Sequence, residues 1–292
     1  MIPVCISMKA NPGAFAPDCF SYLPSRYRIY CNDYKVGRRR SLTSTKRMRE
    51  PFAPLLSLPP PFTLVTLREL GDAHQHAVDI AAEQGAGTMV YVGRFDLAEF
   101  AVVLEPDEPL LTARRALYAG MTALTDALLA YSPPEKMVTI DWPDAVRVDG
   151  GLVGGGRLSW PKDARETEPP EWLVFSAMIR TVSMSDKEPG LHPLASALEQ
   201  EGFDDISAAR IAESFARHLM VATDAWESSG FGEVAKEYVR RLPRESGVIR
   251  QIDDNGDLLT RRLAKAEFDR RKLLPMLAQP SWLDPETGGP RL

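Results

Sequence analysis

Three consecutive glycines, Gly154, Gly155 and Gly156, stand inside a segment that otherwise reads as a β-hairpin over residues 139–158. The pair Asp149-Gly150 supplies the turn, because glycine tolerates the positive φ that tight hairpin turns need. Three glycines weaken a strand unless another group must approach its backbone closely. We therefore predict that they form a floor of bare backbone that binds a substrate. A flexible surface hairpin is the alternative.

Arginines around the glycine strand predict a site for an anion. Arg157 follows the glycines, and a guanidinium binds carboxylate or phosphate through two parallel hydrogen bonds. Because arginine stays charged at biological pH, Arg157 is a catalytic candidate by electrostatics and not as a proton donor. Arg147 on the facing strand and Arg180 after an apolar run are predicted to bind nucleotide phosphates. The alternatives are a solvated Arg157 and a protein partner for Arg180.

Two carboxylates, Asp141 and Asp144, flank Trp142-Pro143. They could hold Mg²⁺ with nucleotide phosphates, since magnesium commonly takes one or two carboxylates and substrate oxygens. Asp144 is therefore the second catalytic candidate. In the structural alternative, Asp144 caps a turn and Asp141 is exposed or paired with an arginine. Trp142 either forms a wall of the substrate pocket or belongs to the core.

We expect no structural metal. His74 and His76 are two residues apart, which places them on different faces of a helix, and the sequence has no zinc-ligand spacing. It also has no P-loop, no Gly-x-Ser-x-Gly and no dinucleotide-binding fingerprint.

The hairpin resembles one in the biotin protein ligase and lipoate ligase superfamily. Those enzymes read Lys-Trp-Pro-Asn-Asp-Val, then a short turn, then Lys-x-Ala-Gly-Ile-Leu. Residues 141–146 match the first half here, and Val153-Gly154-Gly155 matches the second. The superfamily's catalytic lysine falls on Leu152, and its Asn-Asp pair falls on Asp144-Ala145. The resemblance implies an α+β fold, with a mixed β-sheet packed against helices and a small C-terminal β-rich domain.

The resemblance also implies a substrate-binding loop. Biotin ligases carry Gly-Arg-Gly-Arg-Arg-Gly, whose amides and guanidinium groups gather carboxylate and phosphate. Residues 85–90 match it by position and keep both glycines without the arginines. Lipoate ligases read Gly-Gly-Gly-Ala-Val-Tyr at this place. Gly85, Gly87, Thr88 and Tyr91 are thus predicted to bind substrate, and a plain helix-to-strand turn is the alternative.

Hydrophobic periodicity predicts the elements that position these residues. The expected strands are 62–67, 89–92, 100–104 and 172–181, and the expected helices are 72–84, 112–131 and 206–241, the last broken at 228–232. Asn255-Gly256 predicts a second hairpin, between strands 247–253 and 257–261. From Ala264 the chain is expected to return to helix. This order suits helices layered on a mixed sheet.

Charge is distributed unevenly along the 292 residues, whose formal net charge is −5. Residues 1–50 hold ten Lys/Arg against three Asp/Glu, and the remainder holds 25 against 37. An acidic body argues against a nucleic-acid-binding surface. No apolar run reaches the roughly 18–20 residues of a membrane span.

Cys5, Cys19 and Cys31 all lie in the basic N-terminal stretch, so a disulfide framework for the body is excluded and a reducing, cytoplasmic location is expected. We predict a basic, disordered leader over 1–52, with a transit-like segment or a functional arm as alternatives. A ligase-like domain over 53–242 and a small C-terminal domain over 243–292 follow.

Three functions remain open. The first is a cytoplasmic ligase that activates a small carboxylic acid (biotin, lipoate or octanoate) with ATP and Mg²⁺, and transfers it to a lysine of a biotinyl or lipoyl carrier domain. The second is a module that binds the acid or a nucleotide without turnover. The third is a factor that docks a carrier domain. A homodimer is expected from the family resemblance.

Overall fold

The computed structural model describes residues 56–184, 194–204 and 206–291. The predicted leader over 1–52 and its three cysteines lie outside these ranges. The described residues belong to one compact unit that also includes the C-terminal sheet. The predicted domain boundary between 242 and 243 stays a prediction. No helix in the described ranges is long and apolar enough to cross a membrane.

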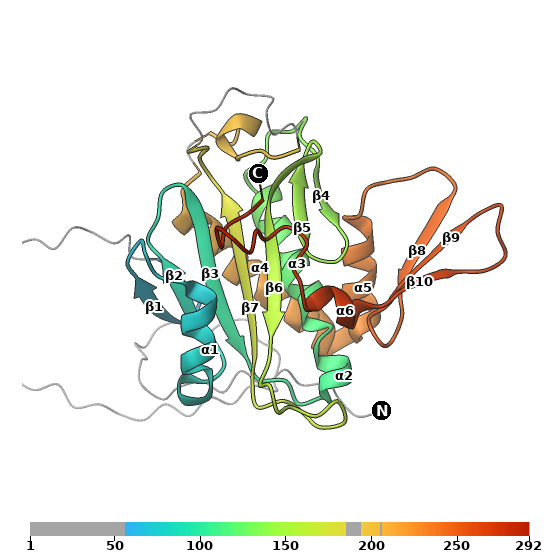
Figure 1. Ribbon diagram of the computed structural model, residues 1–292, viewed down its shortest axis with the longest axis horizontal. Helices are drawn as coiled ribbons and strands as arrows, with labels where there is room; N and C mark the ends of the chain where they lie inside the picture. Colours follow the sequence, from blue (N-terminus) through green and yellow to red (C-terminus); the bar gives the residue numbers. More distant parts are fainter. Residues whose placement is uncertain (1–55, 185–193, 205, 292) are drawn as a thin grey trace, which may run out of the picture. The chain divides into compact units, whose positions relative to one another are not determined.

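A seven-stranded mixed sheet forms the centre of the fold (Figure 1). Its order is β1-β2-β3-β7-β6-β5-β4; β1 pairs with β2 in parallel, and the other neighbours are antiparallel. The strands are β1 (Thr63–Leu67), β2 (Thr88–Val92), β3 (Leu97–Leu104), β4 (Val138–Asp141), β5 (Ala145–Val148), β6 (Gly151–Ser159) and β7 (Leu173–Arg180). The mixed α+β fold predicted from the sequence is confirmed.

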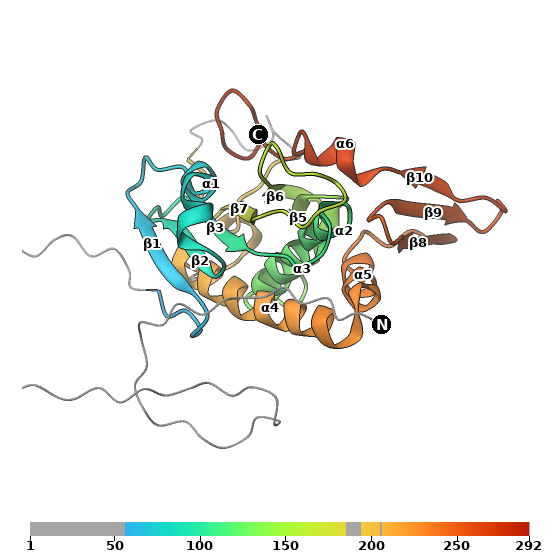
Figure 2. The same ribbon diagram turned by 90° about the horizontal axis from the view of Figure 1, so that it is seen from below.

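Helices cover both faces of the sheet (Figure 2). The larger layer consists of α3 (Ala116–Leu129), α4 (Ala208–Ser229) and α5 (Phe231–Arg240), preceded in the chain by the short α2 (Leu110–Ala113). It packs on the face of Phe100 and Phe175. The single helix α1 (Ala73–Gln84) packs through small alanines on the opposite face, against Val90 and Val103. The part of that second face not covered by α1 carries Gly155 and its neighbours.

The central strands β3 and β7 are buried on both sides, which explains their continuous apolar sequences. Residues 172–181 were predicted to form such a strand, and β7 occupies nearly that range. The predicted break in the 206–241 helix is also confirmed, since Gly230 has φ +83° between α4 and α5.

The C-terminal part forms a separate three-stranded antiparallel sheet of β8 (Val248–Ile252), β9 (Leu258–Arg262) and β10 (Asp269–Arg271). The predicted hairpin around Asn255-Gly256 joins the first two strands. The expected return to helix at Ala264 is wrong: β10 comes first, and only the short α6 (Leu273–Leu277) follows. Pairing of β10 with β9 outweighs the local helical preference of residues 264–272.

Residues 139–158 form the three strands β4, β5 and β6, and Trp142 lies in the turn of the β4–β5 hairpin (138–148), called the Trp142 hairpin below. Tyr118 on α3 links this hairpin to the C-terminal sheet. Its hydroxyl donates to the Gly256 carbonyl at 2.5 Å and accepts from Trp142 Nε1 at 3.0 Å. We expect Tyr118→Phe to lower the free energy of unfolding by about 1–3 kcal/mol, because it leaves a buried donor and a buried acceptor without partners. Urea denaturation followed by circular dichroism measures this. A loss below about 0.5 kcal/mol would show that the two groups find other partners.

Candidate functional site

The Trp142 hairpin borders a cavity of about 430 Å³ between the large sheet and the C-terminal sheet. Trp142 is buried, and the Arg271 guanidinium lies 4.6 Å from the centre of its ring. The cavity is lined by Ile140, Asp141, Trp142, Ala145, Arg147, Leu152, Leu242, Pro243, Arg250, Leu258, Arg271, Met276, Ser281 and Trp282. This volume lies within the range of small-molecule sites, and the lining combines apolar side chains with charged groups, so that polar atoms supply more of its exposed surface than apolar ones.

The charged groups of the cavity are predominantly cationic. Arg147, Arg250 and Arg271 line it together with one carboxylate, that of Asp141. Arg147 Nε lies 2.5 Å from Asp141 Oδ2, so the predicted arginine partner of Asp141 is present. Arg250 donates to the Pro243 carbonyl at 2.6 Å. With the Arg147–Asp141 pair and the Arg250–Glu245 pair at 3.0 Å formed, Arg271 is the lining guanidinium without a carboxylate partner among the described residues, and its charge favours an anionic ligand.

Protein groups, and not a cavity, lie against the three glycines. A Cβ at Gly154 would lie 1.9 Å from the Met178 carbonyl oxygen, and one at Gly156 would meet Met121 and Phe175 beneath α3. A Cβ at Gly155 would meet the Asp144 carbonyl oxygen at 2.1 Å and the Trp282 indole at 2.3 Å. The close approach inferred from the glycines is real. In this structure the approaching groups belong to the protein itself, and the assignment of the three glycines to a substrate floor stays a prediction.

Trp282 covers the outward face of Gly155. Its Nε1 donates to the Gly156 carbonyl at 2.9 Å, and the residue is 1% exposed. The sequence analysis missed Trp282, Arg250 and Arg271. A tryptophan in an aperiodic Pro- and Gly-containing segment gives no periodic signal, and its position on the sheet follows only from the path of the chain.

Asp144 is a buried carboxylate capped by the C-terminal segment. Its oxygens accept hydrogen bonds from Ser281 N at 3.0 Å and Ser281 Oγ at 2.6 Å. Burial raises the pKa of Asp144 to about 6, and the two bonds from Ser281 offset part of this effect. The carboxylate of Asp144 therefore holds the C-terminal segment and does not cap a local turn, as the structural alternative had expected.

The raised pKa of Asp144 predicts a pH-dependent stability. The folded protein holds this proton more tightly than the unfolded chain, so the stabilisation is complete below the unfolded pKa near 4 and is lost as the pH rises through about 6. The difference in unfolding free energy between the wild type and Asp144→Asn should therefore shift by about 2 kcal/mol against the wild type between pH 4 and pH 7. Urea denaturation at both pH values tests this. A constant difference would contradict it.

Arg157 lies beside α1 in a polar group on the same sheet face. Its Nε donates to Ser176 Oγ at 3.2 Å, and its NH2 lies 3.5 Å from Asp72 Oδ1. His74 bridges Ser176 Oγ at 2.8 Å and Ser159 Oγ at 2.9 Å. Burial and the charge of Arg157 lower the pKa of His74 to about 4, so the imidazole is neutral at neutral pH. The spacing of His74 and His76 had argued only against a shared metal, and the two serine partners of His74 lie on β6 and β7, far away in the sequence.

Arg180 binds backbone carbonyls of the C-terminal segment. Its NH2 donates to Pro290 O at 2.7 Å and its NH1 to Ser196 O at 3.2 Å. Desolvation lowers the pKa of Arg180. The partner that a buried arginine requires is thus supplied by the protein in this structure, so Arg180 is not free for a nucleotide phosphate here.

The predicted substrate loop at 85–90 lies away from this site. Thr88 is the first residue of β2, and Val92 is the last. Val92 is aligned across the sheet with Glu99, Met178 and Gly155 on the next three strands. Four residues of strand separate Thr88 from this level of the sheet by about 13 Å. Gly87 packs tightly against the Pro61 carbonyl. Tyr91 is buried under the larger helix layer.

A helix-to-strand turn describes Gly85, Gly87 and Thr88 in this structure, and their assignment with Tyr91 to substrate binding stays a prediction. The turn at the end of β2 that is level with Gly155 is the one between β2 and β3. In this turn, Arg94 pairs with Asp96 at 2.7 Å.

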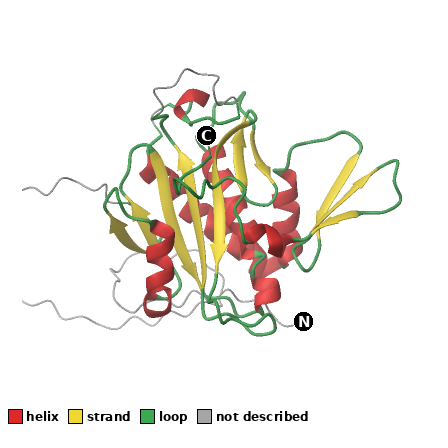
Figure 3. Ribbon diagram, viewed as in Figure 1, coloured by secondary structure: helices red, strands yellow, loops and turns green. Residues whose placement is uncertain are grey.

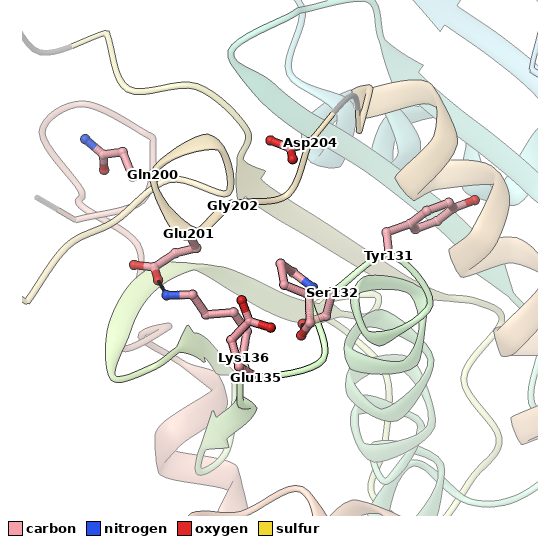
Figure 4. A pocket seen from close by; sticks show the side chains of 9 residues that line it. Tyr131, Ser132, Glu135, Lys136, Gln200, Glu201, Gly202 and Asp204 are labelled. Atoms are coloured by element: carbon pink, nitrogen blue, oxygen red, sulfur yellow. Dashed lines mark hydrogen bonds and ion pairs between the residues drawn. The ribbon is translucent and has the colours of Figure 1, made fainter.

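A second hollow, of about 600 Å³, lies between the end of α3 and the loop at 200–204 (Figure 4). Lys136 is its cation, and it already lies 2.8 Å from Glu201 and 3.0 Å from Asp149. Glu135 and Asp204 also line the hollow, which is open and acidic. It contains none of the residues of the Trp142 hairpin. Among the described residues, no group of three His, Cys, Asp or Glu is placed to hold a metal ion.

Comparisons with known proteins bear on the family and the fold of this chain. The biotin/lipoate A/B protein ligase family matches residues 58–240. No curated protein matches this chain. A biotin protein ligase-like protein of unknown function from Silicibacter sp. is 27% identical, with a TM-score of 0.65 over 77% of this chain and 100% of that one.

The apo biotin protein ligase of Aquifex aeolicus is 14% identical, with a TM-score of 0.55 over 73% of this chain and 100% of the other. A variant of that enzyme in complex with biotin gives 14% identity and a TM-score of 0.51 over 72% and 98% of the two chains. At this identity, the likeness to the Aquifex enzyme extends to the fold alone.

Proposed function

Because this chain belongs to the biotin/lipoate A/B protein ligase family, we propose that it binds a small carboxylic acid of the biotin, lipoate or octanoate type in the Trp142 cavity. The observation that carries this proposal is the composition of the cavity. Three guanidinium groups and one carboxylate surround a partly apolar space beside the motif that the sequence shares with the family. A biotin complex of a ligase with the same fold supports the ligand class.

The lining divides into two parts that suit the two parts of such an acid. Arg271 offers its guanidinium donors to the carboxylate, and a charge-assisted hydrogen bond is stronger than a neutral one. Ile140, Leu258 and Met276 offer apolar surface to the ring or acyl chain. Arg271 rests on Trp142 by a cation–π contact, which orients the guanidinium before the ligand arrives.

Isothermal titration calorimetry with biotin, lipoate and octanoate tests the proposal. We expect Arg271→Ala to weaken binding by at least about tenfold, because one charge-assisted hydrogen bond contributes about 1.5–3 kcal/mol. Arg165→Ala is the matched control, since Arg165 is an exposed arginine paired only with its neighbour Glu168 on the 161–170 loop. The proposal would be contradicted if none of the three acids at millimolar concentration produced a heat of binding. It would also be contradicted if Arg271→Ala and Arg165→Ala bound the acid with equal affinity.

The second candidate is the complete family reaction, in which ATP and Mg²⁺ activate the acid for transfer to a lysine of a carrier domain. Asp144 favours it, because a carboxyl with a pKa of about 6 can exchange a proton near neutral pH. Leu152, at the position of the superfamily lysine, speaks against it: the side chain is apolar and packs in a small cluster with Trp282.

ATP–pyrophosphate exchange in the presence of each acid separates the two candidates. Exchange that is lost in Arg157→Ala supports the ligase. Acid binding without exchange supports the module that binds without turnover. Capture of a biotinyl or lipoyl carrier domain, independent of any small molecule, supports the docking factor.

A further inference from the structure

The C-terminal segment, residues 280–291, crosses one face of the large sheet (Figure 3). Its Ser281 and Trp282 line the Trp142 cavity. We propose that this segment is a displaceable strap that regulates the site: Trp282 occupies the seat on Gly155, and its release opens that seat to the acid. The inference rests on the proposed function, because it concerns regulation of the same site.

One segment engages three residues that the sequence analysis assigned to ligand binding or catalysis. Ser281 binds both oxygens of Asp144, Trp282 covers Gly155, and the carbonyl of Pro290 binds Arg180. These partners come from the β4–β5 hairpin, β6 and β7. A segment with a purely structural role would have no reason to select them together, whereas an internal occupant of a ligand site would.

The seat of Trp282 has the properties of a site for a flat apolar group with one polar atom. The indole lies on the bare backbone of Gly155, and its N–H binds the Gly156 carbonyl. Leu97, Ala145 and Met178 surround it. Trp282 also lines the neighbouring cavity, so its removal would join the seat to that cavity.

The strap is attached through one fully buried side chain, Trp282, and a few hydrogen bonds. Trp282 belongs to a small apolar cluster separate from the main core. Beyond it, residues 284–288 form a local turn closed by Asp284 N–H to Gly289 O at 2.9 Å and Gly288 N–H to Asp284 O at 2.9 Å. Segments with few buried apolar contacts open at lower free energy than the rest of a fold.

Binding of sodium octanoate to full-length variants tests the strap. We expect Trp282→Ala to bind octanoate at least about tenfold more tightly than the wild type, because the seat no longer has an internal competitor. Glu286→Ala, an exposed position on the same segment, should bind as the wild type does. A synthetic peptide of residues 278–291, added to Trp282→Ala, should lower its affinity again. Equal or weaker binding by a folded Trp282→Ala overturns the proposal and leaves the proposed function intact.

Hydrogen exchange on the wild-type protein tests whether residues 280–291 detach locally. This test remains valid even if no acid binds, or if Trp282→Ala does not fold. The amide of Ser281 donates to Asp144, and the amides of Leu283 and Arg291 donate to the carbonyls of Pro280 and Trp282 within the segment. We expect them to exchange at least tenfold faster than those of β6 and β7, through local opening. If the amides of the segment exchange only when those of β6 and β7 do, at the rate of global unfolding, the proposal is overturned. Failure of all acids to bind would instead contradict the proposed function.

Discussion

A Gly154→Ala substitution is expected to lower the free energy of unfolding by about 3–5 kcal/mol or to prevent folding. Gly154 has φ +150°, a conformation that side chains rarely adopt. Its added Cβ would lie 1.9 Å from the Met178 carbonyl oxygen and 3.1 Å from Ile179 Cα. Both are backbone atoms of the central strand β7, which cannot move without breaking its pairing with β3. Urea denaturation and thermal melting measure the loss.

Gly150→Ala is the matched control. Gly150 also has a positive φ, +87°, but a Cβ there would meet nothing within 4 Å. Its loss should stay near 1 kcal/mol, because only the backbone conformation is strained. Equal losses in the two variants would show that β7 yields to the added methyl group.

An Arg115→Ala substitution is expected to lower the free energy of unfolding by about 3–5 kcal/mol, because it leaves a buried carboxylate without its cation. Arg115 lies 2.8 Å from Glu108, and both residues are 7% exposed. A second oxygen of Glu108 is already buried without a hydrogen bond. The guanidinium also donates to the Asp254 carbonyl at 3.0 Å and lies 4.3 Å from the Phe231 ring.

The same substitution should weaken acid binding. Arg115 and Tyr118 hold the turn between β8 and β9, and the C-terminal sheet supplies Arg250, Leu258 and Arg271 to the cavity. Calorimetry on folded Arg115→Ala, at a temperature well below its melting point, measures this effect. Arg165→Ala should change neither stability by more than about 0.5 kcal/mol nor affinity. Unchanged affinity in Arg115→Ala would show that the cavity wall does not depend on this anchor.

The elements of the fold were predictable where the signal is local. The pattern over 206–241 predicted two helices and the break between them, and Asn255-Gly256 predicted the second hairpin. The apolar run at 172–181 predicted a strand buried on both faces. The return to helix after Ala264 failed, because β10 depends on pairing with β9 and short-range propensity does not report such pairing.

The candidate site was predictable in part. Trp142 and Arg147 line the cavity, as the hairpin motif suggested. The loop at 85–90 was placed at the site by position along the chain. In space it lies near the opposite end of β2, since a strand separates its two ends by more than 10 Å.

The sequence by itself determined the order of helices and strands, the Trp142 hairpin and the need for bare backbone at 154–156. Periodicity, turn residues and glycine carry this information within a few residues of each position. Only the tertiary structure decided what approaches that backbone. Met178, Met121 and Trp282 come from β7, α3 and a segment more than 120 residues away, and they meet the glycines because the sheet order brings β6 beside β7 and the chain returns across its face. Contacts between such distant residues depend on the packing of the entire fold, and a local pattern contains no record of that packing.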